Sequence, residues 1–121
     1  MAHSSKKDAI RVLYVDDDPS IIEISKQILM DIDARFEIND ACCVDEAFKK
    51  LETGQHDVVV SDYELPLKNG LEFLRELREQ HREIPFILFT GKDREEVAVK
   101  ALNLGADSYI NKNGSPETVY C

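Results

Sequence analysis

The run Val58–Pro66 constrains the fold of this chain more than any other stretch. It opens with three consecutive valines, reaches a carboxylate at Asp62 and passes into a loop marked by Pro66 and Gly70. A short apolar run bounded by turn residues predicts a strand buried on both faces, at the centre of a parallel sheet. Open α/β sheets place their ligands at the carboxyl ends of such strands. Asp62 is therefore the first candidate functional residue.

Similar apolar runs recur along the chain, and helical patterns separate them. The sequence predicts five strands, at residues 10–15, 36–41, 57–61, 85–89 and 108–110. Helices are expected to follow from residues 19, 44, 70 and 93, where caps, first-turn prolines or apolar stripes occur. The apolar stripe of the first helix is Ile21, Ile24, Ile28 and Ile32, and the expected buried face of the third is Leu71, Leu74 and Leu77. A further helix is expected to begin at Ser115–Glu117, with only its first turn present before Cys121. Residues 1–9 are interpreted as a loose polar tail and residues 10–121 as one domain.

The alternation of strand and helix predicts an α/β fold with right-handed crossovers and helices on both faces. At this size we expect a flavodoxin-like, doubly wound, five-stranded parallel sheet of order 2-1-3-4-5, with the final helix truncated. The switch point of this order lies between the first and third strands. Asp16 and Asp17 follow the first strand and Asp62 follows the third. These three carboxylates are therefore expected to flank one crevice.

Composition limits the classes of function. The formal net charge is −9, which argues against direct nucleic-acid binding because phosphate contacts need clustered Lys and Arg. No apolar run is long enough to span a membrane, and the N-terminus lacks the core of a signal peptide. The three cysteines form no even framework and no metal-ligand spacing. A cytoplasmic domain without membrane attachment is the expectation.

Three carboxylates at adjacent strand ends would repel one another unless a cation lies between them. Mg²⁺ (or Mn²⁺) suits oxygen ligands of this kind, and it also prepares a site for phosphoryl chemistry. Asp62 would then be available as a nucleophile that forms an acyl phosphate. Thr90, at the end of the fourth strand, offers a hydroxyl group, and Lys112, just after the fifth, offers an ammonium. Both fall at the same edge of the predicted sheet and could compensate the charge of a transferred phosphoryl group.

Four segments together resemble a known family. They are Val15-Asp16-Asp17-Asp18-Pro19, Ser61-Asp62-Tyr63-Glu64-Leu65-Pro66 with Gly70, Phe89-Thr90-Gly91, and Tyr109-Ile110-Asn111-Lys112. In this order they resemble the receiver (CheY-like) domain of two-component response regulators. The resemblance extends from Ile10 to about Pro116, and the phrasing of residues 86–106 is similar to receivers of archaeal origin.

The resemblance implies a role for each matching residue. Asp62 would accept a phosphoryl group from a phosphohistidine on the phosphotransfer domain of a histidine kinase. Asp17, Asp62 and the backbone carbonyl of Glu64 would bind Mg²⁺, with Asp16 acting through a water. Thr90 and Lys112 would contact the phosphoryl group. Tyr109 would be an aromatic switch that turns inward as Thr90 moves, although a plain core aromatic is the alternative for this tyrosine. The domain would be a signalling module that catalyses only its own phosphorylation and slow dephosphorylation.

Two departures from the family and two competing functions complete the expectations. Lys112 is followed by Asn113 where the family usually has proline, and we expect a trans bond there because a cis bond before a non-proline residue costs about 3–4 kcal/mol. The truncated last helix would leave an apolar face uncovered, and a homodimer through that face is a hypothesis. The alternative function is a Mg²⁺-dependent phosphohydrolase of the haloacid-dehalogenase kind. That class places a second Asp two residues after the nucleophile, where this chain has Glu64. A degenerate receiver that serves only as a binding surface is the third interpretation.

Overall fold

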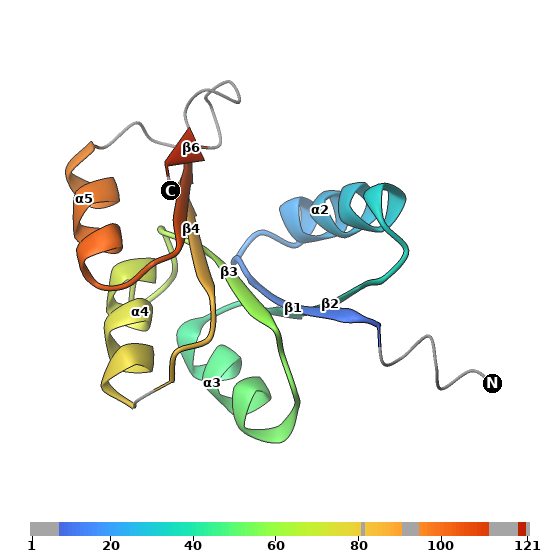
Figure 1. Ribbon diagram of the computed structural model, residues 1–121, viewed down its shortest axis with the longest axis horizontal. Coiled ribbons are helices and arrows are strands. Elements are labelled where there is room, and N and C mark those ends of the chain that lie inside the picture. The colour runs from blue at the N-terminus through green and yellow to red at the C-terminus, as the bar shows by residue number, and fades with distance from the viewer. Residues whose placement is uncertain (1–7, 81, 91–94, 112–118, 121) are drawn as a thin grey trace.

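The computed structural model describes residues 8–80, 82–90, 95–111 and 119–120. Strands and helices alternate along most of the chain (Figure 1). In chain order they are β1 (Ile10–Val15), α2 (Pro19–Ile32), β2 (Phe36–Ala41), α3 (Val44–Thr53), β3 (Val58–Asp62), α4 (Gly70–Glu79), β4 (Phe86–Thr90), α5 (Glu95–Asn103), β5 (Ser108–Asn111) and β6 (Val119–Tyr120).

The strands form one sheet in the order β2-β1-β3-β4-β5-β6. The pairs from β2 to β5 are all parallel, which confirms the predicted order 2-1-3-4-5. β3 lies between β1 and β4, so the strand that carries Asp62 is central. Because the strands are parallel, their carboxyl ends meet along one edge of the sheet.

The helix starts follow from local side-chain chemistry. Asp18 caps α2, accepting a hydrogen bond of 2.9 Å from the backbone N–H of Ser20, and Pro19 occupies the first turn. α4 begins with a capping box in which Asn69 and Glu72 each accept a hydrogen bond from the other's backbone N–H. No helix among the described residues combines the length and the apolar character needed to cross a membrane.

One face of the sheet carries the main core. α3, α4 and α5 lie on this face (Figure 1), and their apolar residues join those of the strands in one cluster. Phe73 of α4 packs edge-on against Phe48 of α3 and Phe86 of β4, with ring centroids 5.2 and 5.5 Å apart. The sequence predicted Leu71 on the buried face of α4. The structure buries Phe73 instead and covers Leu71 only in part. Leu74 and Leu77 are buried as expected.

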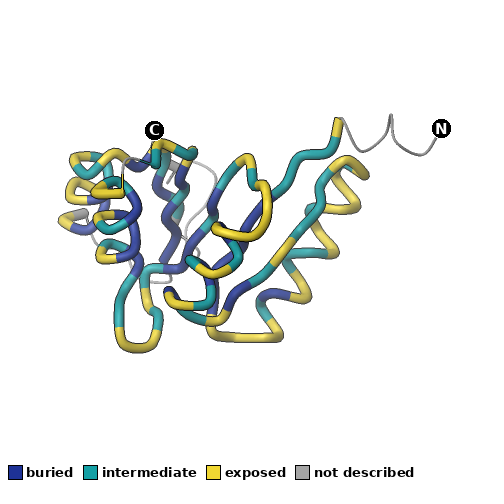
Figure 2. Tube along the Cα trace, turned by 90° about the horizontal axis from the view of Figure 1, so that it is seen from below, coloured by how far each residue is buried: buried dark blue, intermediate teal, exposed yellow. Residues whose placement is uncertain are grey.

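The opposite face is covered only in part, by α2. Ile22 is the buried residue of this helix, whereas Ile24, Ile28 and Ile32 of its predicted apolar stripe are exposed by 57%, 54% and 71%. Figure 2 shows how the buried positions gather on the strands and the exposed ones on the helices and loops. A groove of about 510 Å³ runs between α2 and the strands, lined by Tyr14, Ser25, Ile28, Leu29, Val60, Ile87, Phe89 and Ile110. The prediction that β3 is buried on both faces is therefore wrong on this side, where Val58 and Val60 are only partly covered.

The end of the described chain differs from the prediction of a helix. Val119–Tyr120 form β6, which pairs antiparallel with β5 through Tyr109↔Tyr120 and Ile110↔Val119. The expected start of that helix, at residues 115–117, lies outside the described residues. Val and Tyr favour strands, and β5 would otherwise present an unpaired edge, so pairing satisfies backbone groups on both segments.

Candidate functional site

The sheet register places Asp16 and Asp62 side by side. Val15, the last residue of β1, pairs with Ser61 of β3, and each carboxylate comes one residue later in its own chain segment. On the other side of β3, Asp62 pairs with Phe89, the residue before Thr90. Three strand ends therefore meet at the acidic position, as the sequence predicted.

Asp16, Asp17 and Asp62 form a compact carboxylate cluster. One ligand oxygen from each lies within 4.8 Å of the others. Asp16 and Asp62 are 1% and 6% exposed, whereas Asp17 faces solvent. Two carboxylates that are nearly buried beside a third are costly unless hydrogen bonds or a cation offset the charge. The three carboxylates lie close enough together for one cation to contact all of them.

Backbone groups hold the two buried carboxylates in place. Asp16 Oδ1 accepts a hydrogen bond of 3.0 Å from the Asp18 N–H, and Asp62 Oδ1 accepts one of 3.3 Å from the Glu64 N–H. The hydroxyl of Ser61, which is fully buried, donates to the Asp62 carbonyl at 2.9 Å. This role of Ser61 was not predicted, and only its place next to Asp62 in the chain could have indicated it.

The carboxylates of the cluster also affect the neighbouring Tyr14. Burial raises the pKa of the Tyr14 phenol, the carboxylates of Asp16 and Asp62 raise the pKa further, and a hydrogen bond of 2.9 Å with Ser25 opposes both effects. Tyr14 also packs against Phe89, with ring centroids 5.4 Å apart. The acidic edge therefore has an apolar boundary on the α2 side, which strengthens its electrostatic interactions.

The loop from β3 to α4 brings the backbone close to Asp62. Gly70 donates its N–H to the Tyr63 carbonyl at 2.7 Å, and a Cβ at this glycine would lie 2.5 Å from the Asp62 carbonyl oxygen. Leu67 has φ of 70°, and the Lys68 N–H bonds to the Pro66 carbonyl at 2.8 Å across it. This arrangement is a strained γ-turn. Nothing in the sequence indicated that a leucine would occupy this conformation.

Thr90 and Tyr109 lie on the strands that follow β3 in the sheet. Thr90 is fully buried at the end of β4, where it pairs with Asn111 of β5. Tyr109 is 1% exposed and belongs to the main core cluster, a position that suits both the expected switch and the alternative of a plain core aromatic. Lys112 and the bond to Asn113 lie outside the described residues, as do Gly91 and Lys92. Glu64 is described, with its side chain exposed.

Comparison with known proteins decides the family. The model of the response regulator receiver domain matches residues 12–120. The chain belongs to this receiver-domain family. The receiver domain is 37% identical over 109 residues to the alkaline phosphatase synthesis transcriptional regulatory protein PhoP of Bacillus subtilis, covering 90% of this chain and 45% of that protein. It thus spans about half the length of this relative.

Solved structures give the same result for the fold. A CheY-like receiver domain protein from Methanospirillum hungatei is 33% identical, with a TM-score of 0.78 over 90% of this chain and 86% of that one. The response regulator TrrA from Thermotoga maritima, solved in complex with Mg²⁺-BeF, is 34% identical, with a TM-score of 0.75 over 86% of this chain and 87% of that one. Nothing in these matches supports the haloacid-dehalogenase alternative. The receiver domain is a signalling module of two-component response regulators.

Proposed function

We propose that Asp62 of this receiver domain accepts a phosphoryl group from a phosphohistidine on the phosphotransfer domain of a histidine kinase. The single observation that carries this proposal is the convergence of Asp16, Asp17 and Asp62 within 4.8 Å at the carboxyl edge of the sheet. Thr90, fully buried at the end of the adjacent strand, supports it. Acyl phosphate chemistry needs a nucleophilic carboxylate, further carboxylates that bind a cation, and a hydroxyl that can contact the phosphoryl group.

The cluster fits Mg²⁺ or Mn²⁺. Its donors are hard carboxylate oxygens, two of them nearly buried, and they lie close enough together to share one small cation. Asp17, Asp62 and the Glu64 backbone carbonyl would hold the ion, with Asp16 acting through a water. When bound, the ion neutralises the carboxylates and screens the incoming phosphoryl oxygens.

The transfer moves one phosphoryl group between two residues. A carboxylate oxygen of Asp62 attacks phosphorus in line with the phosphorus–nitrogen bond of the donor. That bond breaks, its electron pair returns to the imidazole nitrogen, and the product is an acyl phosphate on Asp62. Slow dephosphorylation follows when water attacks the same phosphorus, the phosphorus–oxygen bond to Asp62 breaks, and inorganic phosphate leaves with the carboxylate restored. In this proposal the module modifies only itself, and Lys112, next in the chain after Asn111, pairs with the new charge.

The switch would connect Thr90 to Tyr109. A phosphoryl group on Asp62 adds negative charge and acceptor oxygens, and the Thr90 hydroxyl is one strand away from it. Tyr109 pairs with Leu88, two residues before Thr90, so a shift of the β4 end changes the space beside this tyrosine. Such a shift changes a population only if the two states contact the phosphoryl group differently. The inward Tyr109 would belong to the state that phosphorylation favours.

Incubation with Mg²⁺ and acetyl phosphate tests the proposal. Intact-mass measurement should show the addition of one phosphoryl group to the wild type and none to Asp62→Asn. The matched control Asp31→Asn, at an exposed position of α2, should be phosphorylated like the wild type. Equal labelling of Asp62→Asn would exclude Asp62 as the acceptor. Steady turnover of small phosphate esters, with many cycles for each site, would instead favour a phosphohydrolase.

The proposed homodimer requires its own measurement. The exposed isoleucines of α2 and the apolar groove beside them would form the contact. Light scattering at high protein concentration, with and without beryllofluoride as a phosphoryl mimic, should show twice the monomer mass in at least one state. A monomer in both states would remove the homodimer from the proposed partners.

A further inference from the structure

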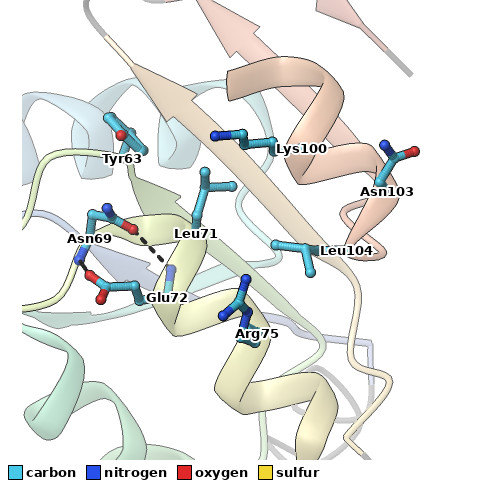
Figure 3. Close-up of a pocket in the computed structure, with 8 residues that line it drawn as sticks. All are labelled: Tyr63, Asn69, Leu71, Glu72, Arg75, Lys100, Asn103 and Leu104. Atoms are coloured by element: carbon cyan, nitrogen blue, oxygen red, sulfur yellow. Dashed lines mark hydrogen bonds between the residues drawn. The ribbon is translucent and has the colours of Figure 1, made fainter. Parts of the chain in front are cut away.

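A second cavity lies between α4 and α5, on the side of the sheet that carries the main core. Its volume is about 530 Å³, which is within the range of small-molecule sites. Figure 3 shows the residues that line it: Tyr63, Asn69, Leu71, Glu72, Arg75, Lys100, Asn103 and Leu104. None of them belongs to the carboxylate cluster, and Tyr63 is the only one adjacent to Asp62 in the chain.

Two cations enter this cavity from different helices. Lys100 reaches from α5 toward α4, and Arg75 extends from α4 into the same space (Figure 3). Within the described part of the chain, neither side chain lies within ion-pair distance of a carboxylate. Lys49 and Arg82 also lack such a partner among the described residues, whereas six other cations have one, in a chain whose net charge is −9. The six are Arg11, Lys26, Arg35, Lys50, Lys68 and Arg78, each 4.0 Å or less from an acidic partner.

The carboxylate in the lining is already engaged. Glu72 Oε1 accepts a hydrogen bond of 2.8 Å from the Asn69 N–H, as half of the capping box of α4. This bond directs the carboxylate toward the start of the helix (Figure 3). Arg75 and Lys100 therefore outnumber the single carboxylate of the lining, and this excess of positive charge favours an anionic ligand.

The rest of the lining favours a flat, partly apolar body. Leu71 and Leu104 are only partly covered and present apolar surface between the helices. Tyr63 supplies an aromatic ring at one end, and Asn103 adds an amide with both donor and acceptor groups. A ring system that stacks on an aromatic or guanidinium face and carries a phosphate would use all of these groups.

We propose that this cavity binds a nucleoside monophosphate, with the phosphate between Arg75 and Lys100 and the base over Leu71, Leu104 and Tyr63. The site is separate from the acyl phosphate chemistry of Asp62 and does not depend on it. The base and the phosphate contribute different contacts, so neither part alone binds as well as the whole ligand.

Titration of the full chain with AMP tests the proposal, with EDTA present so that no divalent ion links phosphate to the acidic cluster. Binding should be saturable, with a Kd of about 1 mM or below, and should shift the amide resonances of residues 71, 75, 100 and 104. Adenosine and inorganic phosphate, measured separately, should each bind at least about tenfold more weakly. Phosphate that binds as tightly as AMP would reduce the site to a charged patch and overturn the proposal, as would the absence of saturable AMP binding.

Variants place the ligand. Arg75→Ala and Lys100→Ala should each weaken AMP binding about threefold to fivefold, as expected for partly solvated ion pairs. Both residues are exposed, so their replacement leaves the core intact. Lys49→Ala removes an equally exposed cation from α3 and should change the affinity less than about twofold. Binding that survives both cavity variants, or that is lost in Asp62→Asn, would place AMP elsewhere and refute the assignment.

Discussion

Gly70 lies directly against the backbone of Asp62. A Cβ at this position would be 2.5 Å from the Asp62 carbonyl oxygen and 2.6 Å from Leu88 Cδ1. The start of α4 is thereby fixed to the end of β3, and the hydrogen bond from Gly70 to Tyr63 reinforces the contact. The glycine serves close approach here, because its φ is not among the positive values of the described residues.

Replacing Gly70 with alanine should therefore destabilise the fold. We expect Gly70→Ala to lower the free energy of unfolding by about 1–3 kcal/mol, because a backbone oxygen cannot move aside as a flexible side chain can. Urea denaturation measures the change. The control is Gly54→Ala, whose Cβ would come no closer than 3.3 Å, to a His56 side-chain atom, and which should cost less. Equal losses in the two variants would show that close approach at Asp62 is not the cause.

Leu67 should be a site where glycine stabilises the protein. It is 97% exposed, so it contributes little burial, and its φ of 70° is unfavourable for a leucine. Leu67→Gly should raise the free energy of unfolding by about 0.5–1 kcal/mol, after the greater chain entropy of glycine is subtracted. Leu67→Val is the matched control and should lower it, because a β-branched residue tolerates positive φ poorly. Thermal unfolding of the three proteins compares them, and a less stable glycine variant would contradict the prediction.

The carboxylate cluster should make stability depend on magnesium. In EDTA, Asp62→Asn should raise the free energy of unfolding by about 1 kcal/mol, since it removes one of three like charges within 4.8 Å. Excess Mg²⁺ should stabilise the wild type and have a smaller effect on Asp62→Asn, because binding to the folded state adds its own free energy. Asp31→Asn, outside the cluster, should leave the magnesium effect unchanged. A wild type with the same urea midpoint in both buffers would argue against a metal site.

His56 should make the fold sensitive to acid. Burial lowers its pKa below the usual 6.5, and the nearby cations add to this while Asp57 opposes it. Its Nε2 lies 3.2 Å from Asn39 Nδ2. The unfolded chain therefore binds a proton at His56 more readily, so the contribution of the neutral ring is complete above about pH 6.5 and is lost as the pH falls toward the lower folded value.

Urea midpoints at pH 7.5 and 5.5 measure this contribution. The wild type should lose more stability than His56→Gln over this interval, because glutamine has no proton to gain. Parallel pH profiles for the two proteins would mean that His56 does not contribute.

The sheet and the carboxylate cluster could be predicted because they depend on order along the chain. Parallel strands have their carboxyl ends at one edge, so the placement of Asp16, Asp62 and Thr90 follows once the strand order is known. The coverage of the faces could not be predicted in the same way. The isoleucines of α2 have the spacing of a buried stripe, yet Ile22 is the residue that the helix buries, and Ile24, Ile28 and Ile32 stay exposed.

The conformation of single loops and the packing of neighbouring elements could not be predicted from the sequence either. The γ-turn at Leu67 contradicts the backbone preference of leucine, so the residue type could not indicate it. The position of β6 depends on an available edge at β5 and not on the helix-start pattern at residues 115–117. The cavity beside Arg75 and Lys100 depends on how two helices, separated by a strand in the chain, are rotated against each other.

The register between β1 and β3 makes the carboxylate cluster depend on correct folding. Asp16 and Asp62 belong to distant parts of the chain, and the parallel pairing of these two strands, which sets Val15 beside Ser61, brings them together. An unfolded molecule keeps every one of these residues and has no cluster. If Asp62 is the acceptor, the fraction of molecules that acetyl phosphate phosphorylates therefore measures the fraction in which β1 and β3 are paired in the native register. The chemistry of the site then becomes a measure of folding that needs no dye or probe.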